Sequence, residues 1–168
     1  MMAIADPTIP RAALRQGILT CLSVAGLRLD ETDLLLDHGF LTQAAVLFSL
    51  AVEEFGKASL LRKAYESGQD PVVVKGFGDH APKIAAAAAH LDANDLLLDN
   101  SGTFDAGVFD AAVFDVGGQV DLPARLSGLY VDWKDGAWKH GVRVDAEVLA
   151  RSSRNVQRRI SRATTEWT

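Results

Sequence analysis

The sequence has 168 residues, a formal net charge of −5 and a hydrophobic share of 48%, which together fit one soluble domain with a hydrophobic core. It contains no run of about 18 uncharged apolar residues and begins without an apolar signal core, so we expect a cytoplasmic protein with no membrane segment. The lone cysteine, Cys21, excludes an internal disulfide and provides no zinc-binding pattern.

Charge is distributed unevenly along the chain. Seven aspartates and no lysine or arginine lie between Lys83 and Arg125, whereas five arginines and no acidic residue occupy Arg151–Arg162. The negative net charge argues against a protein that coats nucleic acid uniformly. The sequence instead combines an acidic middle with a basic tail.

The first part of the chain predicts two long helices. Thr8–Pro10 has the features of a helix start, and apolar residues then recur at helical spacing to about Asp37, where Gly39 is a natural stop. A second helix is predicted from about Leu41 to Glu66. Apolar residues cover all its sides, which is typical of a central helix.

The middle of the chain predicts a third helix followed by an irregular segment. The helix begins near Asp79, a possible N-cap, and includes Lys83–His90. At 104–115 the pair Phe-Asp recurs every five residues, a period that fits neither a helix face nor a strand face. Residues 95–121 are therefore predicted to be an irregular acidic insertion or loop.

Two further short helices complete the predicted fold. One spans Leu122–Trp133, and after a tight turn at Asp135-Gly136 the other runs from about Asp145 to Thr165. The prediction is a single all-α domain over residues 1–168. It has two long antiparallel helices and about three shorter ones.

Three charged residues stand inside the apolar second helix: Glu53, Glu54 and Lys57. Burying an ion costs several kcal/mol unless it is paired, so each charge needs a partner. Lys57 can pair with Glu53 at i,i+4 or with Glu54 at i,i+3, which leaves one carboxylate over. Arg125 is the natural bidentate partner for that carboxylate.

His80 and Lys83, at i,i+3, share one stripe of the third helix. A lone histidine on such a stripe is more often a hydrogen-bonded core residue than a catalyst, but the nearby lysine favours a polar site. Ferritin-like di-iron bundles use Glu-x-x-His pairs, and neither Glu53 nor Glu54 has a histidine three residues later. We therefore expect no metal and no cofactor.

The last predicted helix carries an arginine stripe on one face: Arg151, Arg154, Arg158 and Arg162. The stripe can be a solvated helix surface. It can also contact a phosphate backbone, which makes it a candidate nucleic-acid-binding surface. A third possibility is an acidic partner, including the acidic middle of this chain or of a second subunit.

Three blocks occur in order along the chain: "AVEEFGKASLL" at 51–61, "HAPK" at 80–83 and "RLSGLYVDW" at 125–133. With these blocks, the chain resembles AbiV-type abortive-infection proteins of the HEPN-like superfamily over roughly Leu14–Val148. The resemblance implies phage defence, a helical bundle that often dimerises and, in many members, a metal-independent ribonuclease. The superfamily's nuclease signature is an arginine followed four to six residues later by a histidine. At that spacing this sequence has lysine instead, as in Lys75–His80.

Two functions are open under this resemblance. In the first, the protein binds or cleaves RNA through one catalytic cluster of Glu53, Glu54, Lys57, His80, Lys83 and Arg125. Lys83 or Arg125 would hold a phosphate, and His80 would transfer a proton because an imidazole titrates near neutral pH. In the second, the same cluster is structural and the protein is an interaction module for a phage or host component. We expect a homodimer through the two long helices in either case.

Overall fold

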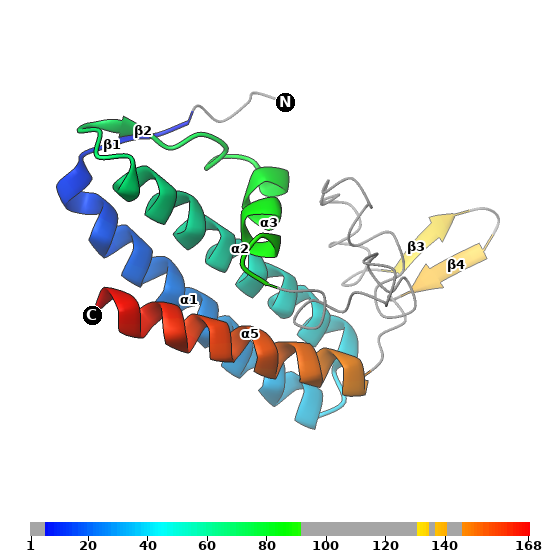
Figure 1. The fold of residues 1–168 in the computed structure, drawn as a ribbon. Helices are drawn as coiled ribbons and strands as arrows, with labels where there is room; N and C mark the ends of the chain where they lie inside the picture. Colours follow the sequence, from blue (N-terminus) through cyan, green and yellow to red (C-terminus); the bar gives the residue numbers. More distant parts are fainter. Residues whose placement is uncertain (1–5, 92–130, 135–136, 141–145) are drawn as a thin grey trace.

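Two long helices form an antiparallel hairpin at the centre of the fold (Figure 1). The structure is a computed structural model that describes residues 6–91, 131–134, 137–140 and 146–168. Helix α1 spans Arg11–Asp37 and helix α2 spans Leu41–Glu66. In the turn between them Gly39 has a φ of 78°, a left-handed conformation that glycine adopts without steric cost. Both predicted long helices and the stop at Gly39 are confirmed.

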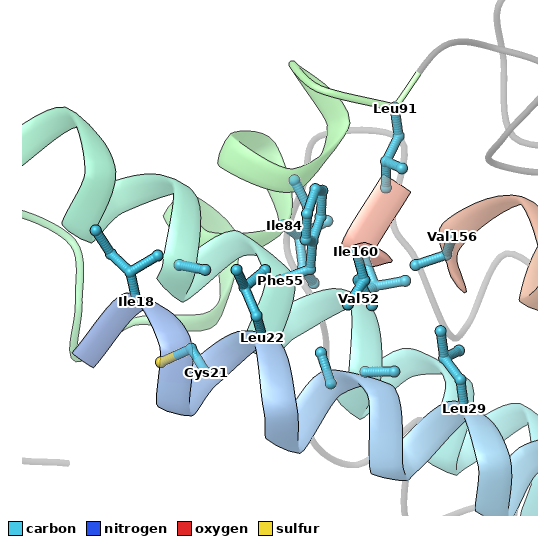
Figure 2. Packing of buried hydrophobic residues seen from close by; sticks show 14 of the residues in the cluster. Ile18, Cys21, Leu22, Leu29, Val52, Phe55, Ile84, Leu91, Val156 and Ile160 are labelled. Atoms are coloured by element: carbon cyan, nitrogen blue, oxygen red, sulfur yellow. The ribbon is translucent and has the colours of Figure 1, made fainter. Parts of the chain in front are cut away.

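The hydrophobic core lies between these two helices, and α3 and α5 contribute to it (Figure 2). Helix α1 buries one stripe at helical spacing, which includes Leu14, Ile18 and Leu22. Helix α2 packs against α1, α3 and α5, and its buried residues accordingly lie on several of its sides. The prediction that the second helix is central is confirmed.

Helix α3, His80–Ala88, packs on α2 immediately after Asp79. Asp79 occupies the N-cap position, but its side chain makes no capping hydrogen bond. The helix ends two residues before the predicted His90. The amides of His90 and Leu91 both donate to the carbonyl of Ala87, at 2.9 and 3.1 Å, and this shared acceptor ends the regular i to i−4 pattern.

A short antiparallel pair of strands joins the start of the chain to the segment before α3. Strand β1, Thr8–Ile9, pairs with β2, Val72–Val73. The sequence prediction placed a helix start at Thr8–Pro10, and for Thr8–Ile9 this is wrong. A residue before proline is disfavoured in the helical region, so Ile9 is extended and α1 begins only after Pro10.

Helix α5, Ala146–Trp167, lies along α1 and also contacts α2 (Figure 1). It buries Leu149, Val156 and Ile160. A hydrogen bond of 2.7 Å from Ser153 Oγ to Asp33 Oδ1 links it to α1. The predicted last helix is confirmed and extends two residues beyond Thr165.

Strands β3, Val131–Lys134, and β4, Ala137–His140, pair antiparallel with Lys134 opposite Ala137. The predicted helix over Leu122–Trp133 is therefore wrong at Val131–Trp133. Short alternating segments on either side of an Asp-Gly pair are typical of a hairpin, and the pairing with β4 decides the outcome.

Three predicted features lie outside the described residues: the remainder of that helix at 122–130, the turn at 135–136, and the acidic segment at 95–121 with its Phe-Asp repeat. Within the described part of the chain, no helix combines the length and the apolar character needed to cross a membrane.

Candidate functional site

The backbones of α2 and α3 come into direct contact at Gly56. A Cβ atom on this buried glycine would lie 1.8 Å from the carbonyl oxygen of Lys83 and 2.5 Å from its carbonyl carbon. No side chain fits in that space, so glycine is required for this approach of the two helices. The crossing brings the first turn of α3 close to the carboxylate of Glu53, one helical turn before Gly56.

Glu53, His80 and Lys83 form one hydrogen-bonded group, which we call the Glu53 cluster. His80 Nδ1 lies 2.9 Å from Glu53 Oε2, and Lys83 Nζ donates to Glu53 Oε1 at 2.9 Å. Glu53 and Lys83 are each only 5% exposed. The His80 side chain is 40% exposed, so it is the member of the cluster that a ligand can reach.

Opposite charge explains how Glu53 and Lys83 tolerate burial. Removing either ion from water is costly, and a directly hydrogen-bonded partner offsets most of that cost. The same carboxylate orients His80. Because an ionised carboxylate can only accept hydrogen bonds, Nδ1 is the protonated ring nitrogen of the neutral imidazole and Nε2 carries the lone pair. A histidine whose Nδ1–H is held by a carboxylate, so that Nε2 is the basic nitrogen, has the arrangement of a general base.

The segment that leads into α3 is tied to the beginning of the described chain. The amide of Val74 donates to the carbonyl of Pro7 at 3.0 Å, and the amide of Gly76 donates to Asp6 Oδ1 at 2.8 Å. Pro82 occupies the first turn of α3, where a missing amide hydrogen costs little. His80 is thus presented at the start of a helix whose approach is fixed by hydrogen bonds.

Glu54 and Lys57 form a separate ion pair on α2, with Lys57 Nζ 2.5 Å from Glu54 Oε1. This is the i,i+3 pairing that their spacing allows. The pair lies near Cys21 of α1 and affects its ionisation. Burial and, less strongly, the charge of Glu54 raise the pKa of the Cys21 thiol to about 11, although Lys57 acts in the opposite direction.

The structure therefore brings three of the six predicted cluster residues together and places two more, Glu54 and Lys57, in their own pair. Arg125, the expected partner of a glutamate, lies outside the described residues. Within the part that is described, no group of three or more histidine, cysteine or acidic side chains has an arrangement that could hold a metal ion.

The arginine stripe lies on the solvent side of α5. Its four members are exposed, and the apolar Val156 and Ile160 of the same helix are buried. The guanidinium of Arg158 donates to the side-chain oxygen of Asn155. The stripe thus presents several positive charges along one helix face, as its spacing predicts.

The sequence analysis did not predict a role for Gly56, because it interpreted the block at 51–61 through its charged residues alone. A signal was available. Glycine inside a helix costs about 1 kcal/mol relative to alanine, so a glycine in the middle of a buried helix often marks a close backbone approach.

A mostly helical bundle built around a long antiparallel pair of helices is consistent with the HEPN type of fold. The family model HEPN_AbiV, described as AbiV, matches residues 13–161, which is most of the chain. The chain belongs to the AbiV family and, with it, to the abortive-infection proteins of HEPN type. No curated protein and no solved structure matches it.

Proposed function

We propose that this AbiV-family protein binds RNA and cleaves it, with His80 as the general base and without a catalytic metal ion. One observation carries the proposal: a half-exposed imidazole is held through Nδ1 by a buried carboxylate at 2.9 Å. Lys83 neutralises Glu53, so the carboxylate can stay ionised while it orients the ring. Membership of an abortive-infection family of HEPN type adds support.

The chemistry uses the RNA itself as the nucleophile. His80 Nε2 removes the proton of a 2′-hydroxyl, and the 2′-oxygen forms a bond to the adjacent phosphorus. The bond from phosphorus to the 5′-oxygen of the next nucleotide breaks, and that oxygen takes a proton from water. The products are a 2′,3′-cyclic phosphate and a 5′-hydroxyl. General-base assistance of this kind contributes about 10²–10⁴-fold.

Lys83 has a supporting role in this scheme, because its buried ammonium is bound to Glu53. The phosphate charge requires accessible cations. We assign the phosphate at the cluster to Arg125, the partner that the sequence analysis expects there, and the neighbouring phosphates of the RNA chain to the arginine stripe of α5, which is exposed to solvent. Arginine suits this role because its planar fork binds phosphate oxygens in pairs.

The nature of the RNA products tests the proposal. Purified protein should cut single-stranded RNA in EDTA and leave 2′,3′-cyclic phosphate ends, which chemical end analysis identifies. A single 2′-deoxy substitution should abolish cutting at that linkage and leave the other linkages unaffected. Cutting at the deoxy linkage, or products that all carry 5′-phosphates, would contradict the proposed nucleophile.

The burial of the Glu53–Lys83 pair favours a second candidate function. A pair this deeply buried can fix α3 on α2 without any chemistry, and the protein would then act by binding a phage or host component. Thermal melts of Glu53→Gln, Lys83→Met and the double variant measure this role. Each single change should cost about 3–5 kcal/mol because it leaves one buried charge unpaired. The double change should cost less than the sum. If the pair is purely structural, the variants show these losses of stability and the parent protein does not cut RNA. If the protein is a ribonuclease, the variants show the same losses and the parent protein cuts RNA.

A further inference from the structure

A cavity of about 230 Å³ lies between the C-terminal half of α5 and the facing parts of α1 and α2. We call it the arginine cavity because three arginines contribute to its lining: Arg62, Arg159 and Arg162. The cavity shares no residue with the Glu53 cluster. It is therefore a second candidate site, and its lining indicates what it can bind.

The floor of the arginine cavity is apolar and consists of core residues. Ile18, Leu22 and Phe55, which are labelled in Figure 2, line it together with Ala58. Each of these four residues is at most 5% exposed, and none has a polar side-chain atom. A polar ligand body on this floor would lose its hydrogen bonds to water and gain none from these side chains. The floor therefore favours a hydrocarbon body.

The rim of the cavity is charged and open to solvent. The side chain of Arg62 is 40% exposed, and Arg162 is exposed as well. Glu166 is the one carboxylate in the lining, and Arg62 also binds Glu66 beside the cavity. With both glutamates counted and His90 taken as neutral, the three arginines leave an excess of one positive charge. A ligand with a single negative charge would balance it.

Arg62 shows which kind of anion the rim accepts, because it already binds carboxylates. Its Nη1 lies 2.9 Å from Oε2 of Glu166 on α5, and its Nε lies 2.9 Å from Oε1 of Glu66. A guanidinium group matches the geometry of a carboxylate with two parallel N–H donors. Arg162 makes no ion pair within the described residues, so its guanidinium is available to a carboxylate that enters from solvent.

We propose that the arginine cavity binds a small carboxylic acid with an apolar body. The ionised carboxylate lies on Arg162 and, in place of Glu166, on Arg62, and the body lies on the apolar floor. An apolar cavity with a few convergent polar groups is the usual form of a small-molecule site. Sites for drug-sized ligands have about 300–1,000 Å³, so this smaller cavity takes only a short body. The proposal depends on no residue of the Glu53 cluster and extends beyond the proposed cleavage of RNA.

Trp167 provides an optical signal for binding. It lines the cavity and packs edge to face against Tyr65, with ring centroids 5.1 Å apart. Its backbone carbonyl accepts a hydrogen bond of 2.7 Å from the guanidinium of Arg15 on α1. A side chain that is held in this way loses little entropy when a ligand arrives. Its emission should change when an acid fills the cavity.

Binding is measured by calorimetry and tryptophan emission with four probes. Octanoate has both the head group and the body, acetate has only the head group, 1-octanol has only an uncharged body, and octylammonium has the opposite charge. Octanoate should occupy one site per chain and bind at least about tenfold more tightly than 1-octanol, because only octanoate forms charged hydrogen bonds with arginine. It should bind at least about a hundredfold more tightly than acetate, because each buried methylene strengthens binding about fourfold. Octylammonium should not displace it.

Matched variants separate this cavity from general surface charge. Arg162→Gln should weaken octanoate binding about tenfold or more, because it removes a charged hydrogen-bond donor. Arg151→Gln is the control, since it makes the same change at an exposed arginine of the same helix that does not line the cavity. It should bind octanoate like the parent. Ala163→Leu should weaken binding by filling the cavity with no change of charge, and Glu166→Gln should strengthen it by removing a competing carboxylate.

Several results would overturn the proposal. Octanoate does not bind at millimolar concentration, or 1-octanol or octylammonium binds as tightly as octanoate. Arg151→Gln weakens binding as much as Arg162→Gln, Ala163→Leu has no effect, or Glu166→Gln brings no gain. The change in emission should also disappear in Trp167→Phe, and a change that persists there would place the ligand elsewhere. None of these measurements involves RNA, so a failure here leaves the catalytic role of His80 untouched.

Discussion

Replacing Gly56 with alanine should destabilise the protein, although alanine is the better helix former. The new Cβ would lie 1.8 Å from the Lys83 carbonyl oxygen, and contacts below 3.0 Å are essentially never seen for real Cβ atoms. The two helix backbones must therefore separate by more than about 1 Å, since the clashing atoms are backbone and cannot rotate away. Overpacking of this kind costs typically about 1–3 kcal/mol and occasionally more.

Helix propensity opposes this loss by about 1 kcal/mol. Because the clash is between backbones, we take the upper end of the overpacking range and expect a net loss of about 2 kcal/mol. For a chain of this size that corresponds to a melting temperature lower by about 4–8 °C. The same separation moves α3 away from Glu53, so the hydrogen bonds of His80 and Lys83 to its carboxylate should lengthen.

Gly26 is the matched control, because it lies inside α1 and an added Cβ would meet nothing within 4 Å. Gly26→Ala should raise stability by about 0.5–1 kcal/mol. Circular dichroism melts and urea titrations of both variants measure the two effects under identical conditions. If Gly56→Ala is neutral or stabilising like Gly26→Ala, the close approach of α2 and α3 does not exist as described.

The double variant Arg154→Glu with Arg158→Glu should have nearly the melting temperature of the parent, because exposed charges contribute little to stability. If the affinity for RNA and its dependence on salt concentration also stay unchanged, the stripe does not contact phosphates. The raised pKa of Cys21, about 11 against an ordinary value of 9.0, should stabilise the fold below pH 9, and this stability should be lost as pH rises toward 11. Urea titrations across that range should show the loss in the parent and a smaller one in Cys21→Ala. HEPN domains often dimerise. On α1, Leu27 and Leu34 lie seven residues apart and are 55% and 60% exposed. We therefore predict a homodimer in light scattering, and we expect the double variant Leu27→Glu with Leu34→Glu to be a monomer. A parent protein that is monomeric at micromolar concentration would reject that interface.

The long helices could be predicted because their signals are local. Helical spacing of apolar residues and the stop at Gly39 determine where α1 ends and α2 begins. The strand at Val131–Lys134 has a shorter local signal, four alternating residues before the Asp-Gly pair. Four alternating residues are compatible with a helix end as well as with a strand, and only the pairing with Ala137–His140 decides between them.

The candidate site shows the same limit. The sequence identifies Glu53 and Lys57 as members of a polar group, but their i,i+4 spacing permits a direct pair that does not form. Lys57 pairs with Glu54 instead, and Glu53 is bound by residues of α3. That outcome depends on where α3 crosses α2, which Gly56 sets. A contact between helices cannot be derived from spacing within one of them.

The most direct test of the proposed function is the single-turnover rate of RNA cutting in EDTA by the parent and by His80→Ala. We predict that the parent cuts and that the variant is slower by about 10²–10⁴-fold. Its melting temperature should fall little, because the His80 side chain is 40% exposed. His38→Ala, which removes an exposed histidine outside the Glu53 cluster, should cut at the parental rate. Three results would contradict the assignment of His80 as the catalytic base. The parent protein does not cut RNA, it cuts only with added magnesium or manganese, or His80→Ala cuts as fast as the parent.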